Sequence, residues 1–132
     1  MARAERRWKV LLVEDDPVYR KVVHGMLLRG GAPIDVQDVG GAKDALEFLR
    51  REPFDCVLLD QFLPDYLGTE FLQVLAARQE KTPVIMLSGL GSRQTSRDAK
   101  DLGAKLVLDK AGLTPEILME AVMRVLRLPR AK

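Results

Sequence analysis

The sequence predicts a single α/β domain of three layers, in which five parallel strands lie between two layers of helices. Strand-like and helix-like segments alternate five times along the 132 residues, with short loops between them. Two of the apolar runs, Phe54–Leu59 and Pro83–Leu87, are nearly continuous, which is typical of strands covered on both faces. Because crossovers between parallel strands are right-handed, this repeated unit places helices on both sides of one sheet.

The first half of the chain contains two strand–helix units. Trp8–Val13 is an apolar run between charged residues and predicts the first strand. Asp16 and Pro17 are a typical helix start, with an acidic N-cap and a proline at the first helical position. The apolar residues of this helix recur at helical spacing until Gly30: Val18, Val22, Val23, Met26 and Leu27. Ile34–Val39 alternates between apolar and polar residues and predicts a strand. A second apolar stripe then predicts a helix: Ala42, Ala45, Leu46, Phe48 and Leu49.

The second half contains three more units. Their strands are predicted at Phe54–Leu59, Pro83–Leu87 and Lys105–Leu108. A helix is predicted over Leu67–Arg78, and a weaker one begins at a Ser92 cap and runs to Leu102. Thr114 and Pro115 repeat the cap-and-proline start. The final helix carries the apolar stripe Ile117, Leu118, Ala121, Val122, Val125 and Leu126.

Composition restricts the function classes. With 47% hydrophobic and 30% charged residues, the chain has the balance of a globular domain, placed at residues 8–128 with short basic tails at 1–7 and 129–132. The net charge of +2 does not indicate nucleic-acid binding. The single cysteine, Cys56, excludes an internal disulfide, and a single histidine, His24, makes a zinc site unexpected. No apolar run has the length of a membrane span or secretory signal, so we expect a cytoplasmic protein.

Polar residues that suit a phosphate site follow four of the predicted strands. Glu14 and Asp15 follow the first strand, and Asp60 follows the third. The carboxyl ends of parallel strands meet at one sheet edge. If the carboxylates of Glu14 and Asp15 lie about 5 Å from Asp60, each pair repels by roughly 3 kcal/mol. A divalent cation would neutralise such a cluster, and oxygen ligands favour Mg²⁺. Asp16 is interpreted as a helix cap only.

Two further polar residues belong to the same edge. Ser88 follows the fourth strand, and Lys110 follows the fifth. A hydroxyl can donate to a phosphoryl oxygen, and an ammonium can pair with phosphate and carboxylate. Asp60 could act as a nucleophile toward phosphorus and form an acyl phosphate. His24 lies within a helix without an evident partner and is interpreted as structural.

From about Lys9 to Leu126 the chain resembles the receiver domains of two-component response regulators, the group that includes the chemotaxis regulators. The resemblance is carried by these segments: Leu11–Pro17, Asp55–Asp60 with Leu63, Pro64 and Gly68, Pro83–Gly89, and Gly103–Ala104 ahead of Lys110. It implies a flavodoxin-like fold with strand order 2-1-3-4-5 and a site where the strand order reverses.

The resemblance also implies a role for each site residue. Asp60 would be the phosphoacceptor, with Asp15 binding Mg²⁺ directly and Glu14 binding it through water. The backbone carbonyl of Phe62 would be a further metal ligand. The phosphoryl group would be contacted by Ser88 and Lys110.

The chain departs from the receiver pattern at four positions. Ala111 replaces the proline that usually follows the lysine through a cis bond, so we expect a trans bond at Lys110–Ala111. Val107 replaces the usual switching aromatic, and signalling could instead pass through reordering of residues 89–100. Phe62 and Leu90, each two residues beyond a site residue, should exclude water and give a long-lived acyl phosphate.

The resemblance implies a switch rather than an enzyme, phosphorylated by a sensor histidine kinase or a phosphotransfer protein. It would act on a downstream protein, without direct nucleic-acid binding or membrane insertion, and a homodimer is left open. One alternative is a receiver-like scaffold that is not regulated by phosphorylation. Another is a small phosphatase of the haloacid dehalogenase type, which would need a second acid where the chain has Phe62.

Overall fold

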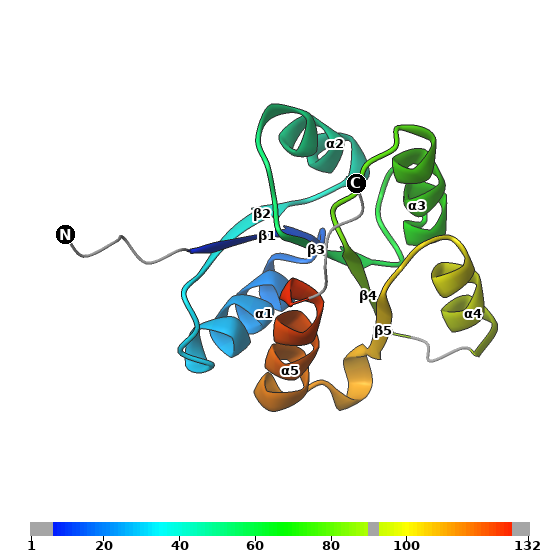
Figure 1. Ribbon diagram of the computed structural model, residues 1–132. Helices are drawn as coiled ribbons and strands as arrows, with labels where there is room; N and C mark the ends of the chain where they lie inside the picture. Colours follow the sequence, from blue (N-terminus) through cyan, green and yellow to red (C-terminus); the bar gives the residue numbers. More distant parts are fainter. Residues whose placement is uncertain (1–6, 90–92, 128–132) are drawn as a thin grey trace.

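A computed structural model describes residues 7–89 and 93–127 and contains a five-stranded parallel sheet in the order β2-β1-β3-β4-β5 (Figure 1). The strands are β1 (Trp8–Val13), β2 (Ile34–Val39), β3 (Cys56–Asp60), β4 (Val84–Ser88) and β5 (Leu106–Asp109). The helices are α1 (Pro17–Arg29), α2 (Ala42–Arg51), α3 (Gly68–Ala77), α4 (Arg93–Asp101), α5 (Pro115–Leu126) and a short 3₁₀ helix, η1 (Lys110–Gly112). The predicted fold class and strand order are confirmed.

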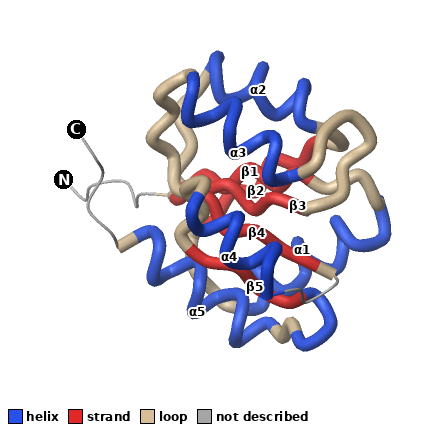
Figure 2. The backbone as a smooth tube through the Cα atoms, turned by 90° about the vertical axis from the view of Figure 1, so that its right-hand side faces the viewer, coloured by secondary structure: helices blue, strands red, loops and turns tan. Residues whose placement is uncertain are grey.

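The sheet separates two apolar clusters, which form because successive side chains of a strand point to opposite faces. In β1, Leu11 and Val13 join the cluster beneath α2, α3 and α4, whereas Val10 and Leu12 join the cluster beneath α1 and α5. Figure 2 shows α2 and α3 on one side of the strands and α1 and α5 on the other. Because helices cover both faces of the sheet, β3 and β4 are entirely buried, and their sequences are nearly continuous apolar runs.

Two helix starts follow the predicted chemistry. The Asp16 carboxylate accepts a hydrogen bond from the Val18 N–H at 2.9 Å, with Pro17 at the first helical position of α1. The Thr114 hydroxyl accepts one from the Ile117 N–H at 3.1 Å at the start of α5. Asp16 is therefore a helix cap, as predicted, and both helices begin where the sequence indicates. 

The structure corrects the predicted apolar face of α1. Val18 and Val22 are 69% and 42% exposed, while Val23 and Leu27 are buried. The buried face of α1 is rotated away from Val18 and Val22 because α1 packs against α5. Tyr19 and Met26 are partly buried and pack against the cluster beneath α1 and α5. Helical spacing alone does not decide which part of a broad apolar stripe faces the core.

The remaining differences are small. β3, β4 and β5 each end one residue later than predicted, at Asp60, Ser88 and Asp109. The described residues contain no cis peptide bond, so the bond at Lys110–Ala111 is trans, as predicted. The predicted Ser92 cap and most of both predicted tails lie outside the described residues. Within the part of the chain that the structure describes, no helix has the length and apolar character needed to cross a membrane.

Candidate functional site

The candidate site lies at the carboxyl ends of β1 and β3, where the order of the strands reverses. Val13 is in register with Leu59, and Asp60 with Leu87 of β4. Glu14 continues the β1 pairing, because its N–H donates to the Val39 carbonyl at 3.0 Å. Both acids are therefore held by backbone that belongs to the sheet, which fixes their positions firmly.

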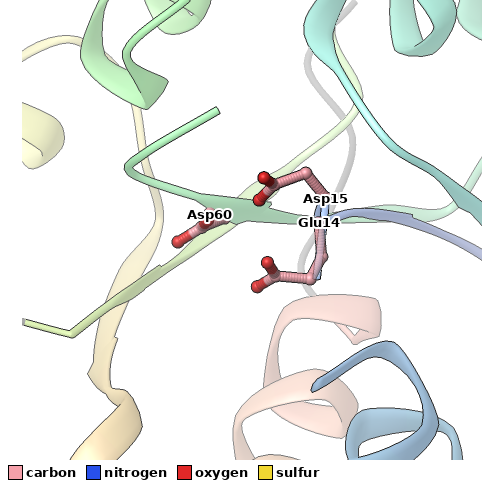
Figure 3. Close-up of side chains that lie close together, drawn as sticks. All are labelled: Glu14, Asp15 and Asp60. Atoms are coloured by element: carbon pink, nitrogen blue, oxygen red, sulfur yellow. The ribbon is translucent and has the colours of Figure 1, made fainter. Parts of the chain in front are cut away.

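Glu14, Asp15 and Asp60 form a compact acidic cluster (Figure 3). One carboxylate oxygen of each lies within 4.8 Å of one oxygen of each of the others. Glu14 and Asp60 are buried, at 2% and 5% exposure, while Asp15 is exposed. At this separation the negative charges are close enough to repel by several kcal/mol.

Lys110 reaches the cluster from η1, at the end of β5. Its Nζ donates to Glu14 Oε1 at 2.7 Å and lies 2.9 Å from Asp60 Oδ1. Burial by itself would lower the pKa of this lysine, but the hydrogen bonds to Glu14 and Asp60 raise it above its usual value. Lys110 is therefore held charged, and it neutralises one of the three carboxylates.

Glu14 is the most constrained of the acids. Its second oxygen, Oε2, accepts a hydrogen bond from the Asp16 N–H at 3.1 Å. Burial raises the pKa of Glu14, and the negative charge of Asp60 adds to that rise, against the lowering effect of the bonds from Lys110 and Asp16. The three carboxylates and one ammonium carry a formal charge of −2. A divalent cation would balance that charge with oxygen ligands alone.

The loop after β3 carries Phe62, two residues beyond Asp60. Phe62 and Leu67 form an isolated antiparallel bridge. Its two hydrogen bonds run from the Leu63 N–H to the Tyr66 carbonyl, 3.2 Å, and from the Gly68 N–H to the Gln61 carbonyl, 2.6 Å. In this pattern the bridge residues exchange no bonds with each other, so the carbonyl of Phe62 points away from Leu67 and is available to a ligand. The Phe62 side chain is 50% exposed.

The other two predicted positions are less directly tied to the cluster. Ser88 is buried at the end of β4, in register with Asp109. Among the described residues, no hydrogen bond joins Ser88 to the three carboxylates. Leu90, the second residue expected to exclude water, lies outside the described residues. Val107 is partly buried against the apolar cluster beneath α2, α3 and α4.

Three polar or aromatic contacts were missed by the sequence reasoning. Asp65 accepts from the N–H groups of Ala42 and Lys43, at 2.9 and 3.0 Å, and so caps α2 from a distant loop. His24 does have a partner, because its Nε2 lies 2.9 Å from Asp38 Oδ2.

The ring of Tyr19 forms the third missed contact, 4.5 Å from Lys110 Nζ. Tyr19 lies two residues after Pro17, which starts the helix, and an aromatic residue at this place could have drawn attention to it. No local sequence signal indicates the other two pairs.

The fold and the site define a class of α/β domain with an acidic site at the reversal point of a five-stranded parallel sheet. A family model described as the response regulator receiver domain matches residues 10–123 of the chain. The chain therefore belongs to the response regulator receiver domain family.

Relatives and solved structures agree with this assignment. The chain is 38% identical to the response regulator protein PilR of Pseudomonas aeruginosa over 98 residues, which are 74% of the chain and 22% of PilR. It is 36% identical to the transcriptional activator protein PfeR of the same organism, over 92% of the chain and 40% of PfeR. The chain thus spans less than half the length of these relatives.

A similar solved structure is the BeF3-activated receiver domain of DrrB. It is 30% identical to the chain, with a TM-score of 0.80 and coverage of 93% of this chain and all of that one. The likeness therefore extends over a whole receiver domain, including the strands that carry the acidic cluster.

Proposed function

We propose that this receiver domain is a phosphorylation switch in which Asp60 accepts a phosphoryl group from a sensor histidine kinase or a phosphotransfer protein. The observation that carries the proposal is the ion pair of Lys110 with both Glu14 and Asp60 inside an acidic cluster. An Asp60 carboxylate oxygen would form a bond to phosphorus, while the bond from phosphorus to the donor breaks and the donor keeps the electron pair. The product is an acyl phosphate.

The residues around Asp60 suit this transfer. The Lys110 ammonium already lies at a carboxylate oxygen of Asp60, where it would meet the oxygens of an incoming phosphoryl group. Ser88, at the end of the next strand, would donate its hydroxyl to the same group. Glu14 holds Lys110 in place through the 2.7 Å hydrogen bond, and the Asp16 N–H holds Glu14.

The donor set fits Mg²⁺. Asp15 and Asp60 would bind the cation directly, Glu14 would bind it through water, and the Phe62 carbonyl would be a further ligand. Hard carboxylate and carbonyl oxygens with room for water are the ligands that Mg²⁺ prefers, and the cluster together with Lys110 carries the charge of −2 that the cation would balance. When bound, Mg²⁺ would neutralise the negative charge that gathers between Asp60 and the phosphoryl oxygens.

This assignment disfavours the two alternatives. An unregulated scaffold would not need buried Glu14 and Asp60 bridged by a lysine, because a buried charge cluster is costly. A phosphatase of the haloacid dehalogenase type would need an acid where Phe62 lies, and Phe62 offers only its backbone. We therefore propose a switch rather than an enzyme.

The output side of the switch is also a proposal. We propose that the chain acts on a downstream protein, without direct nucleic-acid binding or membrane insertion, and a homodimer stays open. The cytoplasmic location and the domain limits of 8–128 stay predictions.

The test is phosphorylation by acetyl phosphate, followed by intact-mass measurement with and without Mg²⁺. We expect a phosphoryl adduct on the wild type that needs Mg²⁺, and no adduct on Asp60→Asn. Asp15→Asn should lose most of the Mg²⁺-dependent adduct. Asp16→Asn is the matched control, because asparagine keeps the helix cap while removing a neighbouring carboxylate, and its adduct should equal that of the wild type. A full adduct on Asp60→Asn would contradict the proposal.

A further inference from the structure

Tyr19 places its aromatic ring against the lysine of the proposed site. The Lys110 ammonium lies 4.5 Å from the ring centroid, within the range of a cation–π interaction. The ring is partly buried in the cluster beneath α1 and α5 and sits in the first turn of α1, just after Pro17. It is therefore a rigid surface, fixed by packing on a helix rather than on a loop.

A rigid contact helps to fix the Lys110 side chain, which is flexible by itself. A lysine ammonium has three donors on a flexible four-carbon stem, and a carboxylate alone does not fix its direction. Two of the donors meet Glu14 and Asp60, and the side chain is only 20% exposed. Removing an ammonium from water strengthens its attraction to a ring face. The ring thus gives the Lys110 ammonium a third neighbour besides the two carboxylates.

The hydroxyl group of Tyr19 does not explain why a tyrosine occupies this position. It is buried and has no hydrogen-bond partner among the residues that the structure describes. A buried hydroxyl without a partner is costly, so it gives no reason for tyrosine at this position. The aromatic face, rather than the polar group, is what contacts the site.

We propose that Tyr19 is a positioning residue for phosphoryl transfer: its ring holds the Lys110 ammonium where that group meets the phosphoryl oxygens on Asp60. The inference rests on the proposed function of Asp60. The ring is neutral and stays in place while the charge on Asp60 changes from a carboxylate to an acyl phosphate. Its contribution is pre-organisation, because an ammonium that is already directed loses less freedom when the phosphoryl group arrives.

The test is a double-mutant cycle on the full chain with Tyr19→Leu, Lys110→Met and both changes together, with Tyr19→Phe as the matched control. The rate of Mg²⁺-dependent phosphorylation by acetyl phosphate is followed by intact mass. We expect Tyr19→Leu to slow the wild type by about three- to thirtyfold, the range of a cation–π contact. Tyr19→Phe keeps the ring and should stay within about twofold of the wild-type rate. In the Lys110→Met background, Tyr19→Leu should cause no further loss.

The unfolding equilibrium of the same variants in urea tests the contact without relying on phosphorylation. We expect a coupling between Tyr19 and Lys110 of about three- to thirtyfold in the unfolding equilibrium constant. If Lys110→Met forms no adduct, this unfolding cycle decides whether the two residues are coupled.

Two results would overturn the inference alone: an unchanged rate in Tyr19→Leu while the wild type is phosphorylated, or equal slowing in Tyr19→Leu and Tyr19→Phe. Equal effects of Tyr19→Leu in both lysine backgrounds would assign the residue to general packing and overturn it as well. A wild type without any adduct would overturn the proposed function of Asp60 and this inference together.

Discussion

Replacing Lys110 with methionine removes the ammonium from the acidic cluster while keeping most of the side-chain volume. In the variant, Glu14 and Asp60 stay buried but lose the ammonium group that bonds to both. At the 4.8 Å limit of their separation and an effective dielectric constant of 20, two carboxylates repel by about 3.5 kcal/mol. Breaking a buried ion pair by removing one partner typically costs about 3–5 kcal/mol. We therefore expect the free energy of unfolding to fall by about 3 kcal/mol when no divalent cation is present.

Magnesium should reverse much of that loss. The cation would take over the neutralisation that Lys110 provides, so it should stabilise Lys110→Met more than the wild type. The assay is urea denaturation followed by circular dichroism, with and without Mg²⁺. Lys105→Met is the matched control: it removes an exposed lysine just before β5 and should change the unfolding free energy by less than about 0.5 kcal/mol.

Two results would refute the reasoning behind this prediction. One is an unfolding free energy for Lys110→Met that equals the wild-type value without Mg²⁺. The other is the same gain from Mg²⁺ in the variant and the wild type. Either result would mean that Lys110 does not compensate the charges of the cluster.

Three further changes test other parts of the account. Asp65→Ala should cost about 1 kcal/mol at neutral pH, because α2 loses its cap. Burial opposes ionisation of Asp65, but the backbone N–H groups of α2 hold its pKa below the usual value. The cap is thus fully effective above the unfolded-state pKa and is lost as the pH falls through the lowered one, so urea melts of variant and wild type should converge below about pH 4. Phe62→Asn should shorten the lifetime of the acyl phosphate several-fold in a dephosphorylation time course, because a polar side chain can hold the attacking water; a wild-type half-life of seconds would contradict the predicted water exclusion. Gly68→Ala should destabilise the fold by about 1–3 kcal/mol in thermal melts, because a Cβ there would lie 2.8 Å from the Asp60 carbonyl oxygen, and an unchanged melt would show that the β3–α3 loop adjusts freely.

The sequence was sufficient to predict the acidic cluster because topology brings it together. Once the runs ending at Val13 and Leu59 are recognised as parallel strands of one sheet, Glu14 and Asp60 must lie at the same edge. Caps such as Asp16 and Thr114 are local, so their hydrogen bonds can also be predicted from neighbouring residues.

Contacts between distant segments could not be predicted in this way. Asp65 caps a helix whose first residues lie more than twenty positions earlier, and the pairing of His24 with Asp38 depends on how α1 packs over β2. Tyr19 meets Lys110 because α1 packs against α5, the helix that follows η1. The contacts of His24 and Tyr19 depend on the rotation of α1 about its own axis, which the apolar stripe of α1 leaves undecided.

The most direct test of the account is to locate the phosphoryl group. After incubation with acetyl phosphate and Mg²⁺, borohydride reduction converts an acyl phosphate on an aspartate into homoserine, which peptide mapping by mass spectrometry can assign. We predict homoserine at position 60 in the wild type, only when Mg²⁺ is present. A phosphoryl group found on another residue, such as His24, with an unmodified Asp60 would contradict the central claim.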